Sequence, residues 1–252
     1  TSSSSVVGFG VFLHDSEMRI DGDGGSLTAS SNGGTGIQVV DSALVVGGGF
    51  TASSNTGSGL LAFRGSVDCG DDVTAASNAG VNLLLTDSTA TLAGSCDLSE
   101  SPAGEASLSN SKLTTGSFTA TSTLGAPIGL ALSKASKAVL GGATITGHGG
   151  PNISLAERST LVLVGDSNVS DCLSQNLLAD DSDVHLDGDT NFSLTAAGGF
   201  ADIHLTNNST GRFLGRPLGC NTASGDGVLV ERGSRAELVD LRMLVAHPGR
   251  CG

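Results

Sequence analysis

Residues 180–189 hold the densest group of side chains suited to acid–base chemistry. The group consists of Asp180, Asp181, Asp183, His185, Asp187 and Asp189. Two carboxylates that flank a glycosidic bond can hydrolyse it, one as the acid and the other as the base or nucleophile. However, the chain has no Trp or Tyr to stack on a sugar ring, and it has only 12 Lys and Arg residues to bind an acidic sugar. We therefore predict an acidic, solvated surface and no catalytic residue.

Two Asp-Gly motifs could bind calcium through carboxylate and corner carbonyl oxygens. They are Asp21-Gly22-Asp23-Gly24 and Asp187-Gly188-Asp189. Because neither completes a known calcium loop, we predict turns, no metal site and no cofactor.

The five cysteines match no metal-binding spacing such as C-x₂-C. One interpretation is that they are small buried apolar residues. A disulfide between Cys220 and Cys251, fastening the C-terminal end, is the favoured pairing, and Cys69 with Cys96 is the second candidate.

Pairs of hydroxyl residues separated by one position recur along the chain, mostly as T-x-S or T-x-T. The members that we assign to one surface are Thr28, Ser30, Thr51, Ser53, Thr74, Ser99, Thr119, Thr121, Thr144, Thr146, Ser193 and Thr195. Ala76 and Asp97 interrupt the series, and Ser170 with Cys172 is its expected seventh pair. Such pairs are also common on any exposed strand. On a rigid lattice, however, they would order water at little cost.

The segments that position these hydroxyl pairs repeat at a fixed spacing along the sequence. LTASSN at 27–32 returns as FTASSN at 50–55 and VTAASN at 73–78, so Asn32, Asn55 and Asn78 are 23 residues apart. A fixed period of this length is typical of a solenoid. Between the copies, apolar residues alternate with other residues in short runs bounded by Gly and Ser, which predicts half-buried strands. We expect the three asparagines to form an internal hydrogen-bonded ladder.

This pattern resembles the right-handed parallel β-helix repeat of the pectin-lyase-like superfamily. The resemblance implies an all-β solenoid of about ten coils, with about 23 residues and three strands in each coil. We predict one domain over 1–252, with a lead-in at 1–9, coils at 10–235 and a C-terminal cap segment at 236–252. The cap is either a last strand or a short helix.

Composition limits the partners. The net charge of −13 argues against binding to nucleic acid or to anionic membranes. No apolar run approaches the roughly 18 residues of a membrane-spanning helix, so we predict no membrane insertion.

The hydroxyl pairs resemble the ice-binding faces of solenoid antifreeze proteins. The resemblance implies a non-enzymatic protein, secreted or on the cell surface, whose partner is ice or ordered water. The alternative is an extracellular structural or adhesive solenoid. It would contact a protein or polysaccharide through an outward apolar patch that includes Phe12, Leu61, Phe63 and Leu84. A polysaccharide-active enzyme is the third hypothesis.

Overall fold

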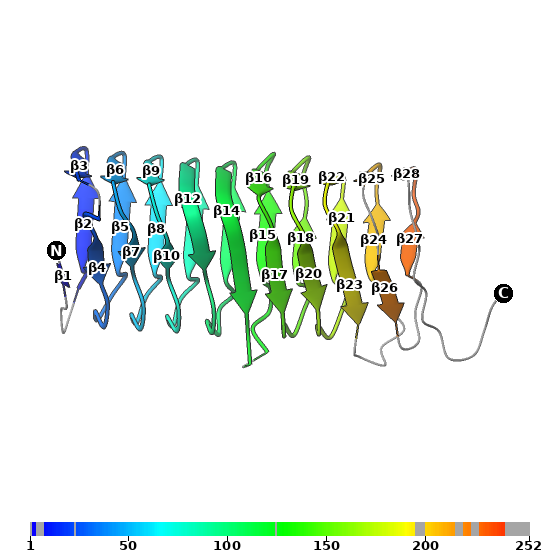
Figure 1. Cartoon of the computed structure of the whole chain (residues 1–252), viewed down its shortest axis with the longest axis horizontal. Coiled ribbons are helices and arrows are strands. Elements are labelled where there is room, and N and C mark those ends of the chain that lie inside the picture. The colour runs from blue at the N-terminus through cyan, green and yellow to red at the C-terminus, as the bar shows by residue number, and fades with distance from the viewer. Residues whose placement is uncertain are drawn as a thin grey trace.

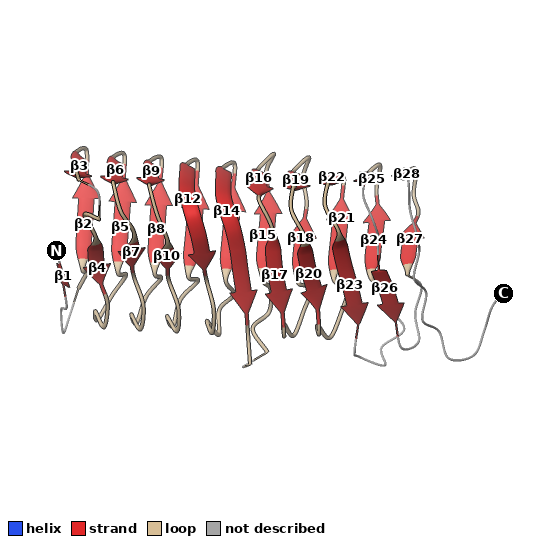
Figure 2. Ribbon diagram, in the orientation of Figure 1, coloured by secondary structure: helices blue, strands red, loops and turns tan. Residues whose placement is uncertain are grey.

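The computed structural model describes residues 2–3, 8–22, 24–123, 125–194, 200–214, 219–222 and 227–239. Within these residues the chain is all-β, and the strands wind into coils that stack along one axis (Figures 1 and 2). Nine coils are complete, and the first two strands of a tenth follow. This confirms the predicted parallel β-solenoid. No helix in the described part of the chain has the length and apolar character needed to cross a membrane.

Strands at equivalent positions of successive coils pair in parallel and form three columns. The first column contains β2 (Val11–His14), β5 (Ile37–Val40), β8 (Leu60–Phe63), β11 (Leu83–Thr86), β13 (Ala106–Ser109), β15 (Leu130–Ser133), β18 (Ile153–Leu155), β21 (Leu177–Asp180), β24 (Ile203–Thr206) and β27 (Val228–Val230). The second contains β3 (Glu17–Ile20), β6 (Ala43–Val46), β9 (Ser66–Cys69), the first parts of β12 (Thr89–Asp97) and β14 (Lys112–Thr121), β16 (Lys137–Leu140), β19 (Thr160–Leu163), β22 (Asp183–Leu186), β25 (Thr210–Leu214) and β28 (Arg235–Val239). The third contains β1 (Ser2–Ser3), β4 (Leu27–Ala29), β7 (Phe50–Thr51), β10 (Val73–Thr74), the second parts of β12 and β14, β17 (Ala143–Thr146), β20 (Ser167–Ser170), β23 (Thr190–Leu194) and β26 (Gly219–Thr222).

The core consists of apolar columns that run along the stack. Ile37, Leu60 and Leu83 pair in exact register, and each is at most 1% exposed. Their outward neighbours are only partly buried, because successive side chains of a strand point to opposite faces. One coil buries too few side chains to be stable alone, so the stacking of coils supplies the stability.

A ladder of serines follows the corner between the first and second strands. The Ser88 hydroxyl donates to the carbonyl oxygen of Thr86 (2.7 Å), and the Ser88 N–H donates to Oγ of Ser111 one coil on (3.0 Å). Ser182 and Ser209 repeat this arrangement. The ladder satisfies backbone groups that the turn would otherwise leave without partners.

Two expectations change at the C-terminal end and at the cysteines. The first residues of the expected cap belong to strand β28, and residues 240–252 lie outside the described residues. Cys69, Cys96 and Cys172 are buried free thiols, so the second-choice disulfide between Cys69 and Cys96 is wrong. Cys251 lies outside the described residues, which leaves its pairing with Cys220 a prediction.

Candidate functional site

The outward side chains of the third column form two parallel rows, which we call the hydroxyl face. Row A contains Thr28, Thr51, Thr74, Asp97, Thr119, Thr144, Asn168 and Asn191. Row B contains Ser30, Ser53, Ala76, Ser99, Thr121, Thr146 and Ser170. Neighbours repeat about 4.8 Å apart along the stack, and the rows lie about 6.7 Å apart along each strand. The structure therefore brings together the predicted residues from Thr28 to Thr146.

The C-terminal part of the face differs from the expectation. Cys172 is fully buried and does not belong to either row, so pairing it with Ser170 as an outward residue was wrong. The true outward pair of β20 is Asn168 and Ser170, because Val169 pairs with the buried Ile145. The backbone of Ser193 continues row B, whereas Thr195 lies outside the described residues.

Row A offers hydroxyl groups that the protein itself does not use. In the described part of the chain, no hydrogen bond engages the side chain of Thr28, Thr51, Thr74, Thr119 or Thr144. Each of these hydroxyl groups can therefore donate to and accept from water.

Row B is instead held by hydrogen bonds within the protein. Oγ of Ser30 accepts the N–H of Ser53 (3.2 Å), and Oγ of Ser53 accepts the N–H of Ala76 (3.1 Å). These bonds between coils fix the serine rotamers, so in the first three coils the hydroxyl groups without a protein partner among the described residues lie in row A.

Asp97 places one carboxylate in the middle of row A. Ser99 donates its hydroxyl to Asp97 (2.6 Å), and Thr121 donates to Ser99 (2.9 Å). This chain orients the row B hydroxyls of two coils toward the carboxylate. Asp97 is also the only charged side chain in the described part of the two rows.

A buried ladder of polar side chains supports the corner next to the hydroxyl face. The predicted bonds are present: Nδ2 of Asn32 donates to Oδ1 of Asn55 (2.9 Å), and Nδ2 of Asn55 donates to Oδ1 of Asn78 (2.9 Å). The ladder then continues beyond the expectation, from Asn78 to Asn82 (2.6 Å) and from Asn82 to Oε2 of Glu105 (2.5 Å). Each amide donates one N–H toward the C-terminal end, and the series ends on the carboxyl group of Glu105. The second N–H groups of Asn55 and Asn78 donate back to the carbonyl oxygens of Ala29 and Ala52.

A second ladder with the same direction fills the later coils. Nδ1 of His148 lies 2.6 Å from Oδ1 of Asn152, Asn152 donates to Asn176 (2.7 Å), and Asn176 donates to Oδ1 of Asp202 (2.9 Å). Burial lowers the pKa of His148, while its bond to Asn152 opposes that shift. The sequence signal for this ladder was the recurrence of one polar residue before successive first-column strands.

Each complete coil contributes one amide, imidazole or carboxyl side chain to the ladders, either from just after its third strand or from just before its first strand. In the first three coils it comes from the corner after the third strand, and the position before the first strand is glycine. A Cβ on Gly36 would lie 2.5 Å from Nδ2 of Asn55, and a Cβ on Gly59 would lie 2.7 Å from Nδ2 of Asn78. The space therefore holds one amide, imidazole or carboxyl side chain per coil, and only a small residue such as glycine or the buried Ser101 fits beside it.

Glu105 is the ladder's buried titratable end. Its side chain is fully buried, and burial raises its pKa from 4.5 to about 8, although the bonds from Ser101 and Asn82 favour the charged form. Nearby Glu100 and Asp97 also raise the pKa. A group whose pKa is higher in the folded state stabilises the fold below its unfolded pKa and loses that contribution as the pH rises.

We expect Glu105→Gln to remove a pH dependence of stability between about pH 4.5 and pH 8. Relative to this variant, the wild-type free energy of unfolding should fall across that window by on the order of 4 kcal/mol. Urea unfolding of both proteins at several pH values measures the difference. Any pH-independent effect of the glutamine side chain shifts the variant's whole curve of unfolding free energy against pH, so it does not affect the comparison of slopes. Parallel curves for the two proteins would contradict a raised pKa at Glu105.

The other two faces differ from the hydroxyl face in charge and polarity. The outward side of the second column is charged and includes Glu17, Arg19, Asp68, Lys112, Lys137, Asp183, Arg212, Arg235 and Glu237. The outward side of the first column carries the expected apolar residues Phe12, Leu61, Phe63 and Leu84. Gln38 lies between Phe12 and Leu61 in that row, so the patch is divided.

The acidic residues of 180–189 do not share one cleft. Asp180 points outward from the first column, where it accepts a hydrogen bond from Asn207 (2.8 Å). Asp183 and His185 point outward from the second column, and Asp187 and Asp189 lie at the following corner. The calcium motif at Asp21 is partly engaged, because Arg19 Nε lies 3.6 Å from Asp21, and Asp23 lies outside the described residues.

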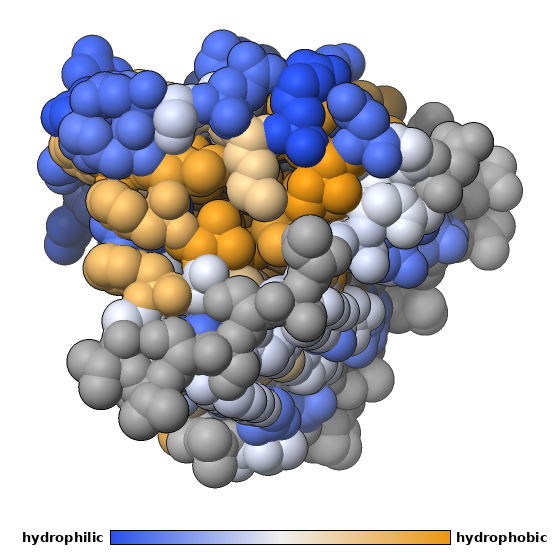
Figure 3. Space-filling view, turned by 90° about the vertical axis from the view of Figure 1, so that its left-hand side faces the viewer, coloured by the Kyte–Doolittle hydropathy of each residue, from blue (hydrophilic) through white to orange (hydrophobic). Residues whose placement is uncertain are grey.

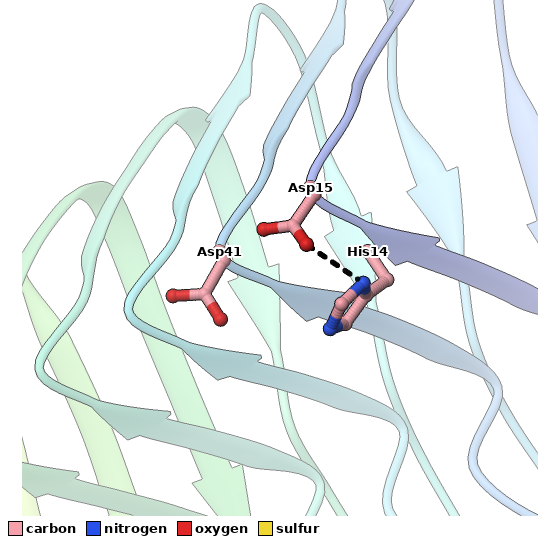
Figure 4. A group of neighbouring side chains, drawn as sticks. All are labelled: His14, Asp15 and Asp41. Carbon is pink, nitrogen blue, oxygen red and sulfur yellow. Dashed lines mark ion pairs between the residues drawn. The ribbon is translucent and has the colours of Figure 1, made fainter.

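One cluster with the composition of a metal site was not found from the sequence. His14 ends β2, and Asp15 and Asp41 occupy equivalent corners of the first two coils (Figure 4). Nδ1 of His14 lies 3.1 Å from Asp15. Arg64 binds both oxygens of Asp41 at 2.6 Å and lowers the pKa of that carboxyl group. A guanidinium group thus already holds one of the three potential ligands.

The described geometry defines a parallel β-solenoid with an open hydroxyl row on one face. Comparisons with models of known protein families, with curated proteins and with solved structures find no match.

Proposed function

We propose that this chain is a non-enzymatic ice-binding protein that orders water on the hydroxyl face. The observation that carries the proposal is row A, where the threonine hydroxyls have no hydrogen-bond partner among the described residues and repeat at the strand spacing. Fixed groups order water at a lower entropic cost than mobile ones. The hydrogen bonds of row B and of the buried ladder support this rigidity. Because its partner is external water or ice, we also propose an extracellular location.

We expect Thr74→Lys to abolish most of the thermal hysteresis and the shaping of ice crystals. A long, strongly hydrated cation would then stand in the middle of row A. The free energy of unfolding should stay within about 0.5 kcal/mol of the wild type, because the site lies on the surface. Thermal hysteresis and recrystallisation inhibition are measured with the purified chain.

Thr91→Lys is the matched control, since Thr91 points outward from the second column of the neighbouring coil. This variant should keep the wild-type activity. Absence of hysteresis and of recrystallisation inhibition in the concentrated wild-type protein would refute the proposal.

The second candidate is an extracellular adhesive or structural solenoid, which one observation favours. Phe9 and Phe12 are 46% and 51% exposed, and their rings stack at 5.3 Å. Exposed aromatic pairs are suited to contacts with proteins or polysaccharides. Loss of adhesion in Phe12→Ser with unchanged hysteresis would support this candidate.

A further inference from the structure

The N-terminal end of the stack exposes part of its core. Val11, Leu13, Met18 and Ile20 point inward but are only partly buried, and they form an apolar area on the end of the molecule (Figure 3). In the described part of the chain, β2 and β3 each pair with a strand on one side only. Such an edge is a template for another parallel strand.

The C-terminal end has the same character. Val228 and Ala236 are partly buried, whereas the inward positions Val230 and Leu238 are 38% and 48% exposed. Within the described residues, β27 and β28 pair only with the preceding coil.

The two ends match in the order of their strands. β1 lies in the third column one coil before β2 and β3, because it pairs with β4. The third column has β26 as its last described strand, one coil before β27 and β28. Hence β1, β2 and β3 of one copy can follow β26, β27 and β28 of another, and all three columns continue in parallel.

The side chains that would meet in such a junction are also complementary. In the inward columns, Val11 would follow Val228 and Ile20 would follow Leu238. On the outward faces and the first corner, the matched positions are Phe12 with Leu229, His14 with Glu231, Asp15 with Arg232, Glu17 with Arg235, and Arg19 with Glu237. Four of these five pairs combine an acidic side chain with a basic one, and the fifth is apolar.

We propose that copies of this chain stack head to tail, with the C-terminal coil of one copy on the N-terminal coil of the next. Complementary charges fix the register of a contact and disfavour wrong partners. A head-to-tail contact between different surfaces does not close on itself, so it produces filaments along the solenoid axis. This inference does not depend on ice binding.

Sedimentation velocity over a concentration series tests the proposal with the purified full chain. The wild type should associate progressively, without stopping at a dimer. Glu17→Arg sets two cations against each other at the junction, and Arg235→Glu sets two anions there. Each change should raise the dissociation constant at least about tenfold. An equimolar mixture of the two variants should associate again, because every junction between unlike variants regains an opposite pair.

The matched control is Lys112→Glu, which reverses a charge in the same column in the middle of the stack. It should associate like the wild type, and circular dichroism confirms the fold of each variant. If Glu17→Arg does not fold, Asp15→Arg with Arg232→Asp as its partner tests the same junction. A wild type that stays monomeric at millimolar concentration overturns the proposal. A closed dimer, or equal effects of Arg235→Glu and Lys112→Glu, also overturns it.

Discussion

Leu132→Asp is expected to abolish the folded state. Leu132 is 2% exposed and lies in an inward column between Leu108 and Leu155. A carboxylate there would have apolar neighbours in both adjacent coils and no cation to pair with. The cost should be at least about 4 kcal/mol, which is a large part of the stability of an ordinary domain. Thermal unfolding followed by circular dichroism measures the effect.

Ala131→Asp provides the control on the same strand. Ala131 points outward and lies between Ser107 and Ser154. The same carboxylate is then solvated, so the melting temperature should stay close to that of the wild type. Similar losses in both variants would mean that strand β15 does not tolerate charge on either face.

Gly165→Ala is expected to be the most harmful single-methyl change at the corners. A Cβ on Gly165 would overlap the carbonyl oxygen of Gly141 in the preceding coil, and a Cβ on Gly141 would overlap that of Gly116. Because the obstacle is backbone, no rotamer relieves the overlap, and two coils must separate locally. We expect a loss of about 3 kcal/mol or more, measured by urea unfolding.

Gly25→Ala is the comparison for this steric effect. A Cβ at Gly25 would lie 3.1 Å from both the carbonyl oxygen of Asp21 and Cγ2 of Ile20. This contact is tight but needs only a small adjustment, so the destabilisation should be much smaller. Equal effects would show that the spacing between coils is not what excludes a side chain at Gly165.

The sequence predicted the columns well because alternation and a fixed period constrain every residue of a coil. Leu60 and Leu83 each have a similar residue 23 positions away, so both the inward face and the register follow from spacing. The hydroxyl face from Thr28 to Thr146 follows from the same register.

The register was misread in the seventh coil because an inward position there is polar. Ser167 pairs with the buried Ala143, and its Oγ accepts the Ala143 N–H (3.0 Å). With a serine inside, Val169 alone marked the inward side, and Cys172 was placed outward by mistake. The continuation of the ladder through Glu105 was missed for a related reason. A buried carboxylate is recognised only when its hydrogen-bond donors are known.

The rule of one amide, imidazole or carboxyl side chain per coil has a consequence for the evolution of this solenoid. Gly36 and Asn55 fill one volume together, and Asn82 with Ser101 fills the equivalent volume in the reverse order. Neither partner can change size alone without a clash or a gap, so substitutions at the two corners should occur in pairs. Related proteins would then keep the hydrogen-bonded ladder while the residue types at the two positions change. The residues at the coil boundaries would covary in such proteins. A sequence comparison that scores each position separately would therefore fail to detect the repeat.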